Sequence, residues 1–108
     1  MDTVCNWAGG IGADYEFIDD ALIDAVPDWY LQKAKGAVTV VTDLARLVVA
    51  RNYLADGYDR AIWVDADVVA FAPEHLAIPE DWPFAFCREV WVRLDSDGAL
   101  VFTQKTNN

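Results

Sequence analysis

The order of helical and extended segments predicts an α/β fold, a partial sheet with flanking helices. Three observations lead to this prediction. A long apolar helix begins near Thr42, an uninterrupted apolar run follows at 61–64, and two extended segments enclose the turn sequence DSDG at 95–98. Uninterrupted apolar runs are typical of central strands that are covered on both faces.

The first part of the chain predicts short elements. A helix that contains two glycines is expected over 2–11, and the stretch YEFI at 15–18 is an expected strand. A short helical stretch follows at 19–25. Another is expected from Pro27, since proline is favoured at the start of a helix.

The clearest helix is expected to begin at Thr42 and to end before Gly57. Threonine is a good N-cap, Asp43 complements the positive first turn, and glycine suits the position after a helix end. Leucine, valine and alanine fill most of the helix, which indicates burial on more than one side.

The remaining elements include a short helical turn at 73–76. Residues 84–94 and 99–103 are expected to be extended, and the DSDG sequence between them predicts a hairpin turn. Trp63 and Trp91, one in the apolar run and one in the hairpin, are expected in the core.

Composition bounds the class of protein. The chain has 108 residues, of which 55% are hydrophobic, and a net charge of −10. The length predicts one domain over 1–108. A domain this small buries so much apolar surface with difficulty, so we expect a homo-oligomer or a part of something larger. The charge argues against a nucleic-acid partner, because neutralising phosphates requires clustered Lys and Arg.

The compartment is expected to be the cytoplasm. No apolar stretch approaches the length of a transmembrane segment, and no secretion signal is visible. Cys5 and Cys87 lack the spacing of metal ligands and are interpreted as buried thiols in a reducing compartment.

Asp65 and Asp67 directly follow the apolar run and carry the strongest chemical signal. In open α/β sheets, ligands gather at the carboxyl ends of strands. Two neighbouring carboxylates repel each other, and Mn²⁺ or Mg²⁺ offsets that repulsion and brings a diphosphate with it. An isolated Asp-x-Asp pair is more often a solvated loop. The apolar residues on both sides, 62–64 and 68–71, favour a site here.

Several stretches resemble one family. They are TDLARL at 42–47, GYDR at 57–60, IWVDADV at 62–68 and FAP at 71–73. They are similar to the A-type (GT-A fold) sugar-nucleotide glycosyltransferases, above all to bacterial capsular and lipopolysaccharide sugar transferases. That family carries an S/T-D-x-x-R helix, then a strand and Asp-x-Asp. The resemblance covers most of 5–92, its specific motifs lie in 42–73, and 15–20 resembles the family's second strand.

The resemblance implies a partial Rossmann-like sheet and the transfer of a sugar from a nucleoside-diphosphate sugar to an acceptor. It implies that Asp65 contacts the donor ribose and the metal, Mn²⁺ or Mg²⁺, and that Asp67 is a direct metal ligand. Asp43 and Arg46 match the helix motif and would contact the donor sugar or its phosphates. They are three residues apart and share a helix face, so an ordinary intrahelical ion pair is the alternative.

A simple geometry predicts that these residues share one site. The helix that follows Asp43 and the strand at 60–64 are of nearly equal length. An antiparallel return near Gly57 would therefore bring Asp65 level with the start of the helix. There, Arg46 and the helix dipole favour an anionic ligand.

Two other interpretations stay open. The chain lacks the family's first strand and ends before its third metal ligand and acceptor region, so we expect a truncated donor-binding domain, and activity of the chain alone is an open question. It is alternatively a non-catalytic fragment that folds and self-associates. A haloacid-dehalogenase-type phosphatase with Asp65 as nucleophile fits less well, because that motif belongs on the first strand and 64 residues precede it here.

Overall fold

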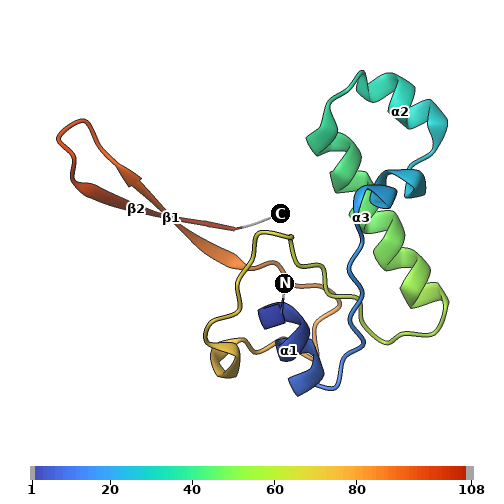
Figure 1. The fold of residues 1–108 in the computed structure, drawn as a ribbon, viewed down its shortest axis with the longest axis horizontal. Helices are drawn as coiled ribbons and strands as arrows, with labels where there is room; N and C mark the ends of the chain where they lie inside the picture. The colour runs from blue at the N-terminus through green and yellow to red at the C-terminus, as the bar shows by residue number, and fades with distance from the viewer. Residues whose placement is uncertain (1, 107–108) are drawn as a thin grey trace. The chain divides into compact units, whose positions relative to one another are not determined.

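The structure is a computed structural model that describes residues 2–106. It combines helices with an antiparallel sheet, so a mixed α/β class is confirmed. The chain divides into two compact units, of which one ends at Phe71 and the other begins at Ala72. In Figure 1 the helices of the first unit are blue to green, and the hairpin of the second is orange to red.

The first helix, α1, spans Asp2–Gly10 and confirms the helix predicted at 2–11. It ends in a Schellman motif. The Gly12 N–H donates to the Gly9 carbonyl at 3.2 Å, and the Ala13 N–H donates to the Ala8 carbonyl at 2.9 Å. Gly12 has a φ of +71°, which glycine adopts without steric cost, and the two bonds satisfy carbonyls that the helix leaves unpaired.

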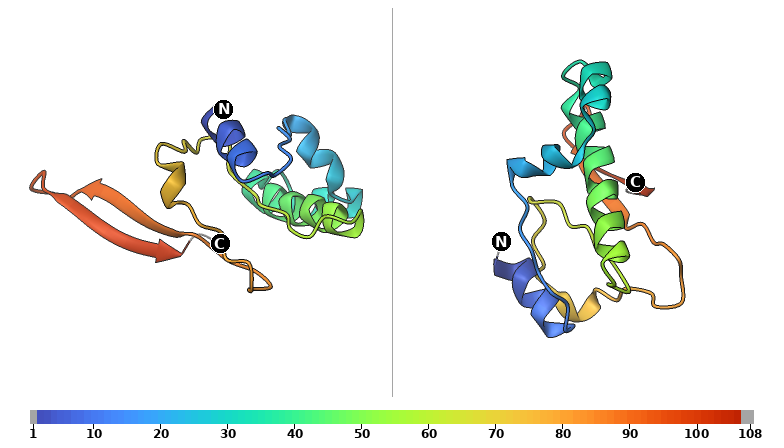
Figure 2. Two further views of the ribbon diagram at one scale, coloured as in Figure 1. Left: turned by 90° about the horizontal axis from the view of Figure 1, so that it is seen from below. Right: turned by 90° about the vertical axis from the view of Figure 1, so that its right-hand side faces the viewer.

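Three helical elements build the core of the first unit. The 3₁₀ helix η1 (Asp20–Ala25) and helix α2 (Asp28–Ala34) both lie against α3 (Val38–Ala55), as the two views of Figure 2 show. Val26, Val41 and Ala45 are buried at the centre. The partly buried side chains around them are Leu22, Tyr30, Leu31, Ala34 and Leu44.

Helix α3 begins at Val38, so the prediction that it begins at Thr42 is wrong. The Thr42 hydroxyl donates to the Thr39 carbonyl at 3.0 Å, a backward bond inside the helix rather than a cap. The physical reason is packing: Val41 is buried in the core, which extends the helix upstream of the local capping signal.

The end of α3 confirms the role predicted for Gly57, which has a φ of +105°. Its N–H donates to the Leu54 carbonyl at 3.4 Å, and the Tyr58 N–H donates to the Tyr53 carbonyl at 3.2 Å. This is a second Schellman motif. The apolar contact that accompanies such motifs is also present, because the rings of Tyr53 and Tyr58 meet edge to face with centroids 5.6 Å apart.

The second unit contains the 3₁₀ turn η2 (Pro73–His75) and the hairpin of β1 (Arg88–Leu94) and β2 (Leu100–Thr106). The hairpin turn predicted at 95–98 is confirmed. Asp95 Oδ1 accepts hydrogen bonds from the Asp97 and Ala99 N–H groups at 2.9 and 2.8 Å. The turn closes through a glycine, at position 98, with a φ of +78°.

The strands predicted at 15–18 and 61–64 are wrong, because both segments are irregular in the structure. Within the described residues, the sheet consists of β1 and β2 alone. A strand pairs its N–H and C=O groups with a neighbouring strand, and neither segment meets one there. None of the described helices is long and apolar enough to cross a membrane.

Candidate functional site

Asp65 and Asp67 lie on one four-residue turn of the first unit. The Val68 N–H donates to the Asp65 carbonyl at 3.1 Å and closes the turn around Ala66 and Asp67. Aspartate is favoured at the first position of such turns. Both aspartates are exposed. A single turn therefore carries two carboxylates that water and ions can reach.

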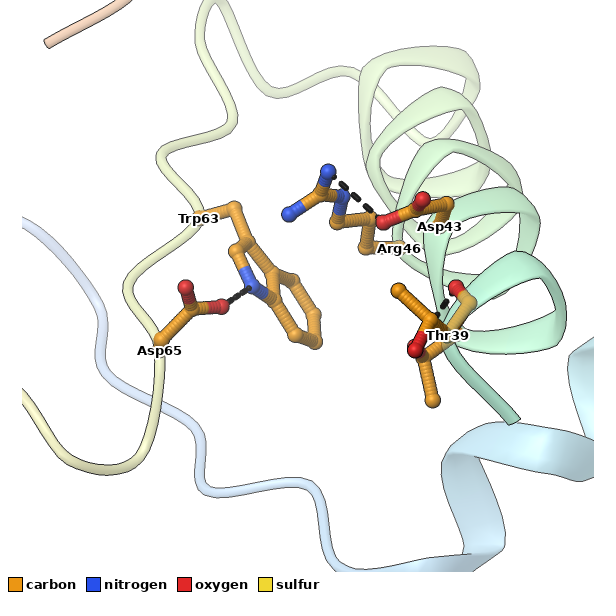
Figure 3. A network of polar contacts seen from close by, with 6 residues as sticks. Thr39, Asp43, Arg46, Trp63 and Asp65 are labelled. Carbon is orange, nitrogen blue, oxygen red and sulfur yellow. Dashed lines mark hydrogen bonds and ion pairs between the residues drawn. The ribbon is translucent and has the colours of Figure 1, made fainter. Parts of the chain in front are cut away.

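The carboxylate of Asp65 is held by a tryptophan. The Trp63 indole Nε1–H donates to Asp65 Oδ1 at 2.8 Å (Figure 3). Within the described residues this is the only side-chain hydrogen bond of Asp65, so Oδ2 accepts none. The orientation of one carboxylate oxygen is thus set by the protein.

The segment that carries the turn is anchored to α1. The Ala70 N–H donates to Thr3 Oγ1 at 3.2 Å. Val4, Trp7 and Ala8 are buried together on one face of the same helix.

Asp43 and Arg46 form an ion pair within α3, with the Arg46 guanidinium 2.8 Å from Asp43 Oδ1. The Arg46 side chain is 24% exposed and that of Asp43 is 52% exposed. In Figure 3 the side chains of Arg46 and Trp63 point toward one another, and Asp65 lies on the far side of the indole. Within the described residues, no hydrogen bond or ion pair joins the Asp43–Arg46 pair to Asp65.

The expected role of the helix dipole is wrong. Because α3 begins at Val38, Asp43 and Arg46 lie in its interior rather than in its first turn. The field of a helix terminus falls off within one turn. An anion beside this face of α3 would therefore meet the guanidinium of Arg46, not the helix N-terminus.

The carboxylates of Asp65 and Asp67 suit a hard cation that keeps water or phosphate oxygens as its other ligands. Within the described residues, no group of three or more His, Cys, Asp or Glu side chains is placed to hold a metal ion. Asp65 and Asp67 are two oxygen donors on one turn. Mg²⁺ is commonly bound by one or two carboxylates together with water and substrate phosphates, and this pair fits that mode.

The surroundings of the turn differ from the expectation. The flanking apolar runs are not buried, since Trp63 is 38% exposed, Val69 62% and Phe71 91%. Trp91 is 55% exposed, so core positions for Trp63 and Trp91 are wrong, and Cys5 and Cys87 are exposed free thiols rather than buried ones.

Sequence reasoning missed the contact between Trp63 and Asp65. The signal for it is their spacing. Residues i and i+2 of an extended segment project to the same side, so an indole donor two positions before an aspartate is within reach of its carboxylate.

Comparison with known proteins adds no relative: no family model matches the chain, and neither a curated protein nor a solved structure matches it. The resemblance to glycosyltransferases therefore rests on the residues of 42–73 and stays a prediction.

Proposed function

We propose that the chain is the donor-binding part of a metal-dependent GT-A glycosyltransferase, a partial Rossmann-like domain that takes a sugar from a nucleoside-diphosphate sugar. The observation that carries the proposal is the turn with two exposed carboxylates, Asp65 and Asp67, together with the direction of Arg46 toward the segment that bears them. Carboxylate oxygens suit a divalent cation, and a guanidinium suits phosphate oxygens.

Each residue has a distinct role in this proposal. Asp67 binds the cation, and Asp65 contacts the cation and the donor ribose. Arg46 contacts the donor phosphates or sugar, and its ion pair with Asp43 holds the guanidinium in place. When bound, Mn²⁺ or Mg²⁺ would stabilise the negative charge that develops on the departing diphosphate.

Binding of Mn²⁺ tests the assignment directly. Electron paramagnetic resonance of free Mn²⁺ should detect one site in the wild-type chain, and Asp67→Asn should abolish it. Asp97→Asn is the matched control, because Asp97 is also an exposed aspartate on a turn but belongs to the hairpin. Equal binding by wild type and Asp67→Asn would remove Asp67 from the site.

A second candidate is a non-catalytic chain that folds, self-associates and binds a cation. One face of the hairpin favours it, because its apolar side chains are all more than half exposed: Val90, Val92, Leu94, Leu100 and Phe102. We propose that this face meets a second copy of the chain in a homo-oligomer. Hydrolysis of a nucleoside-diphosphate sugar separates the candidates, since only the enzyme catalyses it.

The proposed setting is the cytoplasm. Cys5 and Cys87 are both free thiols, which suits a reducing compartment. Of the possible partners, the proposal names a nucleoside-diphosphate sugar and a second copy of the chain, and no nucleic acid, given the net charge of −10.

A further inference from the structure

We propose that Trp63 is a positioning residue that fixes the carboxylate of Asp65 for cation binding; this inference rests on the proposed function. The contact that carries it is the hydrogen bond of 2.8 Å from the indole Nε1–H to Asp65 Oδ1. Groups that orient a metal ligand through a hydrogen bond typically change metal affinity 10- to 100-fold when they are mutated.

The chemistry of the indole suits this role. Its Nε1–H is a donor and never an acceptor, so it binds the carboxylate without competing for the cation. It is also neutral and adds no charge that would repel a divalent ion. The bond engages Oδ1 and leaves Oδ2 of Asp65 without a hydrogen bond from the described residues.

The position of the Trp63 ring restricts the Asp65 carboxylate before any cation binds. Asp65 is exposed, and an exposed carboxylate without a partner samples several rotamers. Trp63 is a wide, rigid side chain with two rotatable bonds, is 38% exposed, and lies on the side of Asp65 that faces Arg46 (Figure 3). Ordering the carboxylate in advance removes part of the entropy that cation binding would otherwise cost.

The chain contains a matched contact that serves as a control. In β1, the Trp91 indole donates to Glu89 Oε2 at 2.8 Å, with the same spacing of two residues. There the ammonium of Lys105 lies 4.0 Å from the centre of the Trp91 ring. A cation of the protein thus already accompanies that indole–carboxylate pair. In the adjoining hairpin turn, Asp95 Oδ1 accepts hydrogen bonds from the Asp97 and Ala99 N–H groups, whereas Trp91 bonds to Glu89 and not to an aspartate of that turn.

Phenylalanine variants separate the two contacts. Trp63→Phe keeps a ring but loses the N–H. We expect it to weaken Mn²⁺ binding 10- to 100-fold, measured by electron paramagnetic resonance of free Mn²⁺. Trp91→Phe should bind Mn²⁺ like the wild type.

A second measurement uses the unmodified chain. In a ¹⁵N-labelled sample each indole N–H gives its own cross-peak, and bound Mn²⁺ broadens the peaks of nearby protons. The peak of Trp63 should disappear at substoichiometric Mn²⁺. Equal Mn²⁺ affinity of Trp63→Phe and wild type, or a Trp63 peak that persists when Mn²⁺ is bound, overturns the positioning role alone. Absence of Mn²⁺ binding in the wild type overturns the proposed function as well.

Discussion

The phenol of Tyr58 donates a hydrogen bond of 3.0 Å to Asp14 Oδ2. It joins the residue after Gly57, at the end of α3, to the segment that follows α1. The phenol of Tyr53 donates to Glu16 Oε2 in the same segment. Two tyrosine–carboxylate bonds therefore hold this segment in place, although it pairs with no strand among the described residues.

The hydrogen bond to Asp14 predicts that the phenol of Tyr58 ionises at a higher pH than an ordinary tyrosine. The hydrogen bond and the negative charge of Asp14 raise the pKa of Tyr58 above its ordinary value of 10.0. Because the pKa is raised in the folded state, the stabilisation is fully present below pH 10 and is lost as pH rises through the folded pKa. Ultraviolet titration should show a late-ionising component, and Tyr58→Phe should lower its amplitude by one tyrosine.

The control for this titration is Tyr15→Phe, since the phenol of Tyr15 forms no hydrogen bond with the described residues. We expect the late component to persist in that variant. An unchanged amplitude of the late component in Tyr58→Phe would contradict the role of Asp14.

Replacing Gly57, the glycine at the end of α3, should lower the free energy of unfolding. A Cβ at Gly57 meets no atom within 4 Å, so the cost of Gly57→Ala comes from its φ of +105° alone. We expect a loss of about 1 kcal/mol in the free energy of unfolding, measured by urea titration. Gly9→Ala, in α1 and equally unobstructed, should instead stabilise by about 0.5–1 kcal/mol.

Two adjacent valines of α3 test the core. Val41 is 6% exposed and belongs to the buried cluster, whereas Val40 is 46% exposed. Val41→Ala removes two buried methyl groups and should lower the free energy of unfolding by about 1–2 kcal/mol. Val40→Ala should change it by less than about 0.5 kcal/mol. Equal effects of both variants would place the buried face of α3 elsewhere.

The apolar face of the hairpin predicts self-association. Phe102 pairs with Val92 on this face, whereas Thr103 points to the opposite face. Sedimentation of the wild type should reveal a dimer or larger species, and Phe102→Lys should shift it toward the monomer. Thr103→Lys is the matched control and should leave the association unchanged. A monomeric wild type at tens of micromolar would contradict the proposal.

The features that sequence predicted well are those that local conformation decides. Gly57 and the DSDG turn require positive φ or a side-chain acceptor at a fixed position, and both were recognisable without tertiary information. The start of α3 was misplaced because burial of Val41 outweighs the capping signal of Thr42. A strand at 61–64 depends on a neighbour, which the apolar pattern by itself does not guarantee.

The candidate site was predictable in its residues more than in its contacts. Asp65 and Asp67 stand out as a pair beside an apolar run, and the spacing of Asp43 and Arg46 indicates their ion pair. The hydrogen bond from Trp63 was missed because the apolar run was interpreted as part of the core. A tryptophan in the core contributes mainly buried apolar surface, so its N–H was not considered as a donor to Asp65.

We propose above all that Asp65 and Asp67 bind a divalent cation together with a nucleoside diphosphate. The most direct measurement is calorimetric titration of uridine, guanosine, adenosine and cytidine diphosphates into the chain, with Mn²⁺ present or removed by a chelator. We expect at least one of them to bind at least tenfold more tightly with Mn²⁺, and we expect Asp67→Asn to abolish this difference while Asp97→Asn retains it. Binding of none of the four, or binding that Mn²⁺ and Asp67→Asn leave unchanged, would contradict it.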